Sequence, residues 1–211
     1  MYTISFKYDT AAIIREFELS MDRDVRLKAA IDNVAYQIFR RAHDIMLKTF
    51  DEHLVTKELK AGPLGDNLSV TVGGYGNLFA FLGFDYAAPD PTEELRAYLV
   101  SLGSARLVKT TRKNTVVYYR TPLIEEEKVR EKSKTLWGDG RSWAYSIQTG
   151  DFSDDAALSH FLYTEWYGKN ARSGQGLQVK GHIVNEQRKF YPIQYISEII
   201  DKYQKAINRT I

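Results

Sequence analysis

Residues 24–50 read DVRLKAAIDNVAYQIFRRAHDIMLKTF, and their hydrophobic pattern decides the fold. The apolar residues recur at intervals of three and four, which is the period of one face of an α-helix. A helix from Asp24 to Phe50 rises about 1.5 Å per residue and so extends about 40 Å, the width of a small domain. The opposite face is charged and polar, so we expect it to meet water or a partner. The face predicted to be buried carries Leu27, Ile31, Val34, Ile38, Ala42 and Ile45.

The end of the chain repeats this helical pattern. Residues from Pro192 to about Asn208 predict an amphipathic helix with one isoleucine-rich face. That face carries Ile196, Ile199, Ile200, Tyr203 and Ile207. Shorter helices are predicted over residues 10–17, 90–103, 123–136 and 153–166.

Other segments have the alternation or the β-branched content of strands. Residues 105–111 and 115–121 flank Arg112-Lys113-Asn114 and predict a hairpin. Further strands are predicted over residues 3–8, 68–72 and 142–149. Hairpin connections without regular strand–helix alternation favour an α+β fold, in which an antiparallel sheet is packed by a long N-terminal helix and a C-terminal helix. We expect one structural domain over residues 1–211, with loop and helix insertions at about 60–104 and 123–140.

The composition is that of a globular protein with an excess of aromatic residues. The 211 residues are 44% hydrophobic and 27% charged, and none is cysteine, which excludes disulfide scaffolds and thiolate metal sites. No apolar stretch is long enough for a membrane span and the N-terminus lacks a signal-peptide pattern, so we expect the chain to remain where it is made. Aromatic residues make up 13% and cluster at 75–86 and 152–167, which suits a protein that buries them in an assembly.

Charge is unevenly distributed although the formal net charge is only +2. The segment 85–94 carries four acids and no base, and the segment 104–122 carries five bases and no acid. Patches of opposite sign suit head-to-tail contacts between copies of one subunit. The alternative, a solvated hairpin and an acidic helix start, remains open at this point. The charged residues are Asp85, Asp90, Glu93 and Glu94, and Arg106, Lys109, Arg112, Lys113 and Arg120.

No catalytic or metal-binding pattern is present in the sequence. The four histidines, His43, His53, His160 and His182, do not have the spacing of a metal motif. The glycine-rich stretches at 73–77 and 173–176 lack the residues of a phosphate loop or a nucleophile elbow. We therefore expect a protein that is not an enzyme and has no cofactor and no metal. Two alternatives are a hydrolase that binds a cation at Asp151–Asp155 and a nucleic-acid-binding module with Tyr118 and Tyr119 on its basic hairpin.

Four stretches resemble the neck, or tail-completion, proteins of tailed bacteriophages. They are GGYGNLFAFLGF at 73–84, GRSWAYSIQTG at 140–150, ARSGQGLQVK at 171–180 and HLVTKEL at 53–59. In order and spacing the resemblance covers about residues 25–205. It implies a virion structural protein without catalytic residues, which forms a ring at the head–tail junction and leaves a passage for DNA. It also implies a long helix and a C-terminal helix on an antiparallel sheet.

The resemblance implies partners and a location as well. The partners would be six or twelve copies of the chain itself, the adjacent connector and tail-tube proteins, and passing DNA in non-specific contact, with no membrane. The location would be the neck or tail of a virion assembled in the host cytoplasm. Alternatives are a tail terminator and a basic nucleic-acid-binding module. Candidate interface residues are Asp85, Asp90, Glu93, Arg106, Lys109, Arg112, Lys113, Tyr75, Phe79 and Arg172, and candidate DNA-channel residues are Arg40, Arg41 and Lys48.

Overall fold

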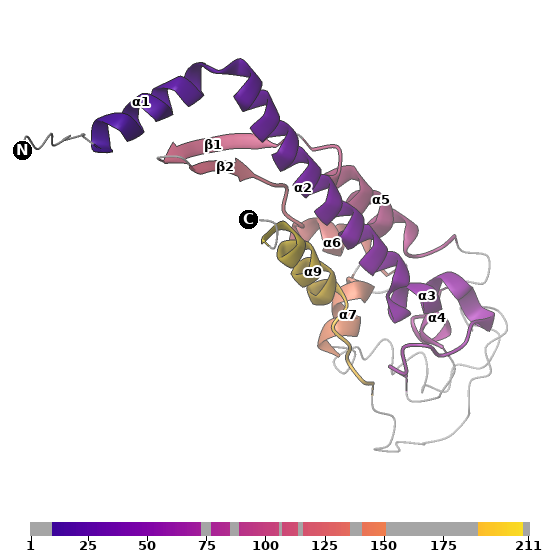
Figure 1. Cartoon of the computed structure of the whole chain (residues 1–211). Coiled ribbons are helices and arrows are strands. Elements are labelled where there is room, and N and C mark those ends of the chain that lie inside the picture. Colours follow the sequence, from indigo (N-terminus) through magenta and orange to yellow (C-terminus); the bar gives the residue numbers. More distant parts are fainter. Residues whose placement is uncertain are drawn as a thin grey trace, which may run out of the picture. The chain divides into compact units, whose positions relative to one another are not determined.

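The chain divides into two compact units, which we number in chain order. Unit 1 comprises residues 1–41 and 105–122, and unit 2 comprises residues 42–104 and 123–211. Both stretches expected as insertions, 60–104 and 123–140, belong to unit 2. The structure is a computed structural model, drawn in Figure 1, that describes residues 10–72, 77–84, 89–105, 107–113, 116–135, 141–150 and 190–208.

Helices account for most of the described residues. The longest, α2 (Val25–Glu52), confirms the helix predicted over 24–50 and runs through the boundary between the two units. The C-terminal helix α9 (Ile196–Asn208) is also confirmed. The other helical elements are α1 (Thr10–Arg23), α3 (Leu54–Ala61), η1 (Gly62–Leu64), α4 (Leu78–Phe81), α5 (Glu93–Leu102), α6 (Glu126–Lys132) and α7 (Trp143–Thr149).

The predicted antiparallel sheet packed by two helices is wrong. In the described part of the chain, β1 (Val108–Lys113) and β2 (Val116–Arg120) are the only strands, and they pair only with each other. Their register pairs Val108 with Arg120 and Lys113 with Val116, so the predicted hairpin is present, but Arg112 and Lys113 belong to β1 and not to the turn in which they were expected. A two-stranded ribbon offers no broad face on which two helices could pack. The predicted strand at 3–8 and helix at 153–166 lie outside the described residues.

The segment predicted as a strand at 142–149 is helix α7. Its buried side chains, Trp143, Ala144 and Ile147, follow the helical period rather than strict alternation. The Ser142 hydroxyl accepts the N–H of Tyr145 at 3.2 Å and caps the helix, which is a preferred role of serine. Gly150 ends it with a left-handed φ of 72°.

The segment predicted as a strand at 68–72 is irregular. Val70 has a φ of 60°, in the left-handed region that no extended strand visits. The N–H of Ser69 donates to the Glu58 carboxylate at 2.7 Å, so this donor is used by a side chain and not by a neighbouring strand. A side-chain partner from α3 therefore replaces sheet pairing here.

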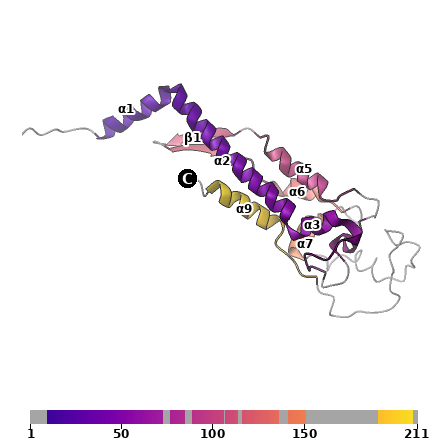
Figure 2. The ribbon, with the colours of Figure 1, turned by 45° about the vertical axis from the view of Figure 1, so that its right-hand side comes forward.

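Unit 2 contains nearly all of the buried side chains in the described part of the chain. Tyr195, which precedes α9, is completely buried, with ring centroids 6.1 Å from Phe50 and 6.0 Å from Trp143. Helix α7 packs at the beginning of α9 (Figure 2), where Oε1 of Gln148 accepts the N–H of Ser197 at 2.8 Å. These contacts bring α2, α7 and α9 to one core.

Unit 1 contains α1, the first part of α2 and the hairpin. Its one buried residue among those whose side chains are described is Phe39. The Tyr119 hydroxyl on β2 donates a hydrogen bond to the Asp32 carboxylate on α2. Burial, followed by this bond, raises the pKa of Tyr119 to about 12, so the phenol stays a donor at neutral pH. Unit 1 thus has a tertiary contact but only a small core.

Candidate functional site

Helix α1 presents an unburied apolar face. Ile13, Ile14 and Phe17 lie within about 100° of one another around the helix axis, as their spacing of one and four residues requires. Ile13 and Phe17 are each 56% exposed, and every α1 side chain that the structure describes is exposed. We call these three residues the α1 face.

More exposed apolar side chains continue along unit 1. Scattered single apolar residues are normal on a surface, but a gathering of them marks an interaction site. Val34, which belongs to the predicted buried face of α2, is 55% exposed. The exposed large apolar residues that unit 1 adds to the α1 face are Leu19, Val25, Val34, Tyr36 and Tyr118.

The turn between α1 and α2 is fixed by Asp24. Its Oδ1 accepts the N–H groups of Arg26 at 2.8 Å and Leu27 at 3.1 Å, which is the hydrogen bonding of an N-terminal cap. The Ser20 hydroxyl donates to the carbonyl of Phe17 at 2.8 Å near the end of α1. Local hydrogen bonds therefore determine where α2 begins.

A second exposed apolar surface belongs to unit 2. It is the segment 62–72, which we call the braced loop. Leu64 is 87% exposed and Val70 is 62% exposed, and Leu68 between them is also exposed. The left-handed φ of Val70 is unfavourable for a β-branched residue by about 1–3 kcal/mol. The N–H of Val70 donates to Oδ1 of Asn67 at 3.0 Å and helps to hold this conformation.

The side chain of Glu58 on α3 accepts a hydrogen bond from the inner side of the braced loop. Its side chain is completely buried, and its oxygens accept the N–H of Ser69 at 2.7 Å and the N–H of Leu78 at 2.5 Å. Nδ2 of Asn77 donates to the carbonyls of Gly62 at 2.9 Å and Gly65 at 2.8 Å. A buried carboxylate with backbone donors on both oxygens is a strong restraint. The loop is thus fixed on its inner side while its apolar tips face outward.

The two units carry net charges of opposite sign. Unit 1 has twelve Lys and Arg residues against six Asp and Glu, a net charge of +6. Unit 2 has seventeen against twenty-one, a net charge of −4. The +2 of the whole chain therefore conceals an uneven distribution of charge between the two units.

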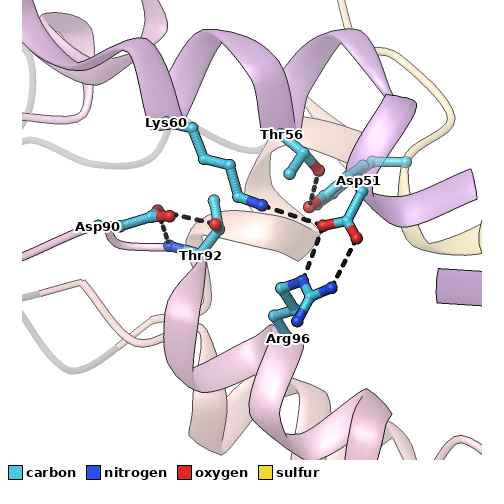
Figure 3. Close-up of polar contacts among 7 residues, drawn as sticks. Asp51, Thr56, Lys60, Asp90, Thr92 and Arg96 are labelled. Atoms are coloured by element: carbon cyan, nitrogen blue, oxygen red, sulfur yellow. Dashed lines mark hydrogen bonds and ion pairs between the residues drawn. The ribbon is translucent and has the colours of Figure 1, made fainter. Parts of the chain in front are cut away.

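A polar junction connects three helices of unit 2 (Figure 3). Asp51 on α2 receives two bonds of 2.8 Å from Arg96 on α5 and one of 3.0 Å from Lys60 on α3. The Arg96 hydrogen bonds are the main cause that lowers the pKa of Asp51 from 3.8 to about 2, with Lys60 lowering it further and burial opposing them. All three groups are engaged with one another, so the junction positions helices and shows no nucleophile or base.

The described histidines also have structural partners. Nδ1 of His53 accepts the N–H of Val55 at 3.2 Å, and Nε2 donates to the carbonyl of Gln194 at 3.2 Å. Burial is the main cause that lowers the pKa of His53, which keeps the ring neutral and able to accept. Nε2 of His43 lies 3.0 Å from the carbonyl of Leu99. The other two histidines lie outside the described residues.

The charged candidates for an interface are only partly described. Asp85, Arg106 and Arg172 lie outside the described residues. Oδ1 of Asp90 accepts the N–H of Thr92 at 2.8 Å and its hydroxyl at 2.7 Å, which starts α5, and Glu93 is exposed in the first turn. Lys109, Arg112 and Lys113 lie on β1, opposite Tyr119, Val117 and Val116.

Of the two aromatic interface candidates, Tyr75 and Phe79, only Phe79 belongs to the described residues. Tyr75 lies outside the described residues. Phe79 is only 3% exposed, and its ring centroid is 5.4 Å from that of Phe84. Its place in this chain is therefore the core of unit 2 and not the surface. Phe79 is apolar, and an apolar residue between glycines fits a core as well as an interface.

The three candidate DNA-channel residues are exposed on α2. The Arg40 guanidinium lies 5.3 Å from the centroid of the Tyr36 ring, and Lys48 Nζ lies 3.9 Å from a Glu52 oxygen. Arg41 is seven residues from Lys48 and lies near its helix face, whereas Arg40, eight residues away, lies about 80° around the helix axis. This alignment is compatible with contact to phosphates but is also common on a solvated helix.

The described part of the chain contains neither a cluster of metal-binding side chains nor a helix that could span a membrane. No group of three or more His, Asp and Glu side chains there is arranged to hold a metal ion. Among the helices so described, none has both the length and the apolar character of a bilayer span. The acidic cluster Asp151–Asp155 lies outside the described residues.

The sequence reasoning missed the α1 face and the braced loop. The first had a signal, because Ile13, Ile14 and Phe17 share one side of a helix that was predicted over 10–17. The braced loop had no such signal, because the sequence around Glu58 does not indicate that this glutamate is buried. No protein-family model matches the chain, and neither a curated protein nor a solved structure was found to be similar to it.

Proposed function

We propose that this chain is a structural assembly protein of a tailed bacteriophage, which forms a ring of identical subunits in the neck at the head–tail junction. The four quoted stretches support the phage neck, and the exposed apolar residues of unit 1 support assembly. The observation that carries the proposal is the α1 face, because a stable monomer gains nothing from three large apolar side chains in water.

The chemistry of the described residues also supports a structural role. The polar side chains with perturbed pKa values bind one another or the backbone, as Asp51 and His53 do. Perturbed groups in a catalytic site are instead aimed into a cleft that takes substrate. Asp51 and His53 thus contribute to the architecture of unit 2.

The first test is the mass and shape of the assembled protein. Light scattering on the purified chain over a range of concentrations should give a mass of six or twelve subunits, and negative-stain electron microscopy should show closed rings. Virions purified from an infected culture should carry the protein at the neck under antibody labelling. A protein that is absent from the virions would overturn the phage assignment, and an isolated monomer that also fails to assemble on connectors would overturn the ring.

The hairpin charge gives a second, independent test. Reversal of Arg106, Lys109 and Arg112 to Glu should weaken assembly, and the effect should shrink as salt screens the charges. An unchanged oligomer mass would exclude the hairpin from the interface.

A nucleic-acid-binding module is the second candidate, because unit 1 carries a net charge of +6. Binding to random duplex DNA with an affinity that falls steeply with salt would support it. Assembly without such binding would favour the ring. A tail terminator is the other ring-forming alternative. Antibody labelling at the tail end of the neck would favour it over the proposed neck ring.

A further inference from the structure

One exposed side of α2 within unit 1 carries arginine and amide side chains and no acid. Its residues follow one another at spacings of three and four, which places them within about 100° of one another around the helix axis. Asp32, the only acidic residue of α2 in unit 1, lies about 130° from the middle of this group. We call the group the α2 polar face, and it consists of the exposed residues Arg26, Ala30, Asn33, Gln37, Arg40 and Arg41.

The arginines of the α2 polar face keep their charges uncompensated. In the part of the chain that the structure describes, no carboxylate forms an ion pair with Arg26, Arg40 or Arg41. The Arg40 guanidinium lies 5.3 Å from the centroid of the Tyr36 ring, which is a neutral partner. A solvated helix face typically alternates acids and bases that pair across one turn. The α2 polar face instead presents three positive charges without a negative one.

The rest of unit 1 packs on the other side of the helix. The Asp32 carboxylate accepts the hydroxyl of Tyr119 on β2. The buried residue Phe39 lies about 150° from the middle of the α2 polar face. The hairpin and the small core of unit 1 therefore support α2 from behind, and the polar face points away from them.

The ends and the middle of the α2 polar face differ in chemistry. Arg26 and Arg40 mark its two ends, which lie about 21 Å apart along the axis at 1.5 Å per residue. The major groove of B-DNA is about 12 Å wide and admits an α-helix, so a helix that crosses it extends over the phosphates on both borders. Arginine is the side chain best suited to bind phosphate. The two ends therefore match the phosphate backbones.

The middle of the α2 polar face matches the floor of the same groove. Asn33 and Gln37 lie there, and their amides can donate to and accept from the major-groove edge of adenine. Ala30 is small enough to let the helix approach closely, and its methyl group can contact that of thymine. Each part of the face thus meets a chemical group that it fits.

We propose that the α2 polar face binds duplex DNA, with α2 in the major groove, its arginines on the bordering phosphates and its amides on the base edges. The inference goes beyond the proposed ring, because binding needs only one subunit. It places a nucleic-acid site on α2 and not on the hairpin. Lys48 is not part of this site, because it belongs to unit 2 and has Glu52 as a neighbour at 3.9 Å.

The composition of the face favours duplex DNA over two other anionic partners. Single-stranded nucleic acid is bound by stacking its bases on aromatic side chains, and the α2 polar face has none. An acidic protein surface would pair with the arginines but offers Asn33 and Gln37 no regular row of donors and acceptors. The major groove supplies both the negative charge and that row.

The test measures binding of the full chain to a labelled random-sequence duplex by fluorescence anisotropy over a range of salt concentrations. The face variant changes Arg26, Arg40 and Arg41 to Gln, which is also a good helix former, so it should fold. Its dissociation constant should rise at least about tenfold. The slope of log affinity against log salt should become shallower by about 3, because each lost phosphate contact removes about one released counterion.

A matched control removes the same charge elsewhere in unit 1. The variant Arg15→Gln, Arg23→Gln, Lys28→Gln lowers the net charge of unit 1 from +6 by three, as the face variant does, but leaves the α2 polar face intact. Its salt slope should equal that of the wild type, because charges outside the contact are screened. Circular dichroism and thermal melting of both variants check that they fold.

An amide variant tests the groove itself. Asn33→Ala with Gln37→Ala should weaken binding and leave the salt slope unchanged, because amides release no counterions. Unchanged affinity in this variant would overturn the placement of α2 in the groove.

The remaining outcomes separate this inference from the proposed ring. Equal losses in the face variant and its charge control, or tighter binding to single strands than to the duplex, would overturn the inference. Rings that form from a wild type without affinity for duplex DNA would overturn it and leave the ring intact. A wild type that stays monomeric on connectors but binds duplex through the α2 polar face would support the inference and overturn the ring. If the wild type does not bind DNA and the face variant loses assembly, a protein surface covers the face and the inference is wrong.

Discussion

The hydroxyl groups of Thr56 and Tyr195 lie 2.8 Å apart inside unit 2, although 139 positions separate the two residues in the chain. Both side chains are completely buried. Burial raises the pKa of the Tyr195 phenol, so it remains protonated and can share a proton with threonine at any ordinary pH. The bond joins α3 to the segment that leads into α9 and thus ties the C-terminal helix to the middle of the chain.

Tyr195→Phe should lower the free energy of unfolding by about 1–2 kcal/mol, because it leaves the Thr56 hydroxyl buried without this partner. Thr56→Val should cost a similar amount. The double variant should cost less than the sum, since both polar groups are then gone. Urea unfolding of all four proteins measures the coupling. Strictly additive losses would show that the two hydroxyls do not stabilise each other.

Gly103→Ala should destabilise unit 2 by about 1–3 kcal/mol through overpacking. A Cβ at this position would lie 2.5 Å from Cε1 of the His43 ring, which is buried and bonded to Leu99. Gly150→Ala is the matched control, since its backbone is left-handed with a φ of +72° but the atom nearest to the new Cβ, in the Pro192 side chain, is at an ordinary contact distance of 3.4 Å. That control should cost only about 1 kcal/mol, for backbone conformation. Thermal melting compares them, and equal losses would contradict the steric explanation.

Asp51→Asn should lower stability by about 1 kcal/mol at neutral pH, a value reduced for the partial exposure of the ion pair. The folded pKa of Asp51 is about 2 and the ordinary value is 3.8, so the stabilisation is complete above 3.8 and is lost as the pH falls toward 2. The difference between variant and wild type should therefore vanish in strong acid. Glu52→Gln is the control, because its pair with Lys48 is long and exposed and should contribute less than about 0.5 kcal/mol.

His53 should make the protein less stable as the pH falls below 6.5. Burial lowers the pKa of His53 in the folded state, so the unfolded chain takes up a proton at a higher pH than the folded chain does. The free energy of unfolding therefore decreases as the pH falls. Protonation of Nδ1 also removes the acceptor for Val55. His53→Asn keeps an N-terminal cap without the titration. Its stability, measured by urea unfolding, should be flatter than that of the wild type between about pH 5 and 7; parallel curves would contradict this role.

The long helices could be predicted from the sequence because their periodicity is strong over many turns. The helix predicted over 24–50 matches α2, and Asp24 lies at its cap. The C-terminal helix begins at Ile196 and not at Pro192, because the N–H of Ile193 bonds the carbonyl of Ile147 and holds this stretch extended. Helix ends are thus decided by contacts with distant residues, which a local pattern does not contain.

What covers an amphipathic face could not be predicted. The stripe that includes Val34 and Ala42 was expected to be buried throughout, but Ala42 is buried in unit 2 while Val34 is largely exposed in unit 1. Periodicity reports only that a helix has an apolar side, and a core and a partner give the same pattern.

The candidate site was least accessible to sequence reasoning where buried polar groups decide it. Glu58 lies in a short helix with Lys57 and Lys60, and this charged sequence is typical of a solvent-exposed helix. Its side chain nevertheless accepts a hydrogen bond from the braced loop. The alternation at Trp143 and Tyr145 favours a strand in the sequence, but in the structure the Ser142 hydroxyl caps a helix there. A single hydrogen bond in each place outweighs the propensity of several residues.

Helix α2 belongs to both units, and this has a consequence for the order in which its turns open. Its second half is anchored by Met46 and Phe50, which are completely buried, whereas the first half has only Phe39. Starting a helix is costly but extending one is not, so the anchored half serves as the nucleus for the other. Amide protons of residues 42–50 should therefore exchange with solvent most slowly, and protection should decline turn by turn toward Val25.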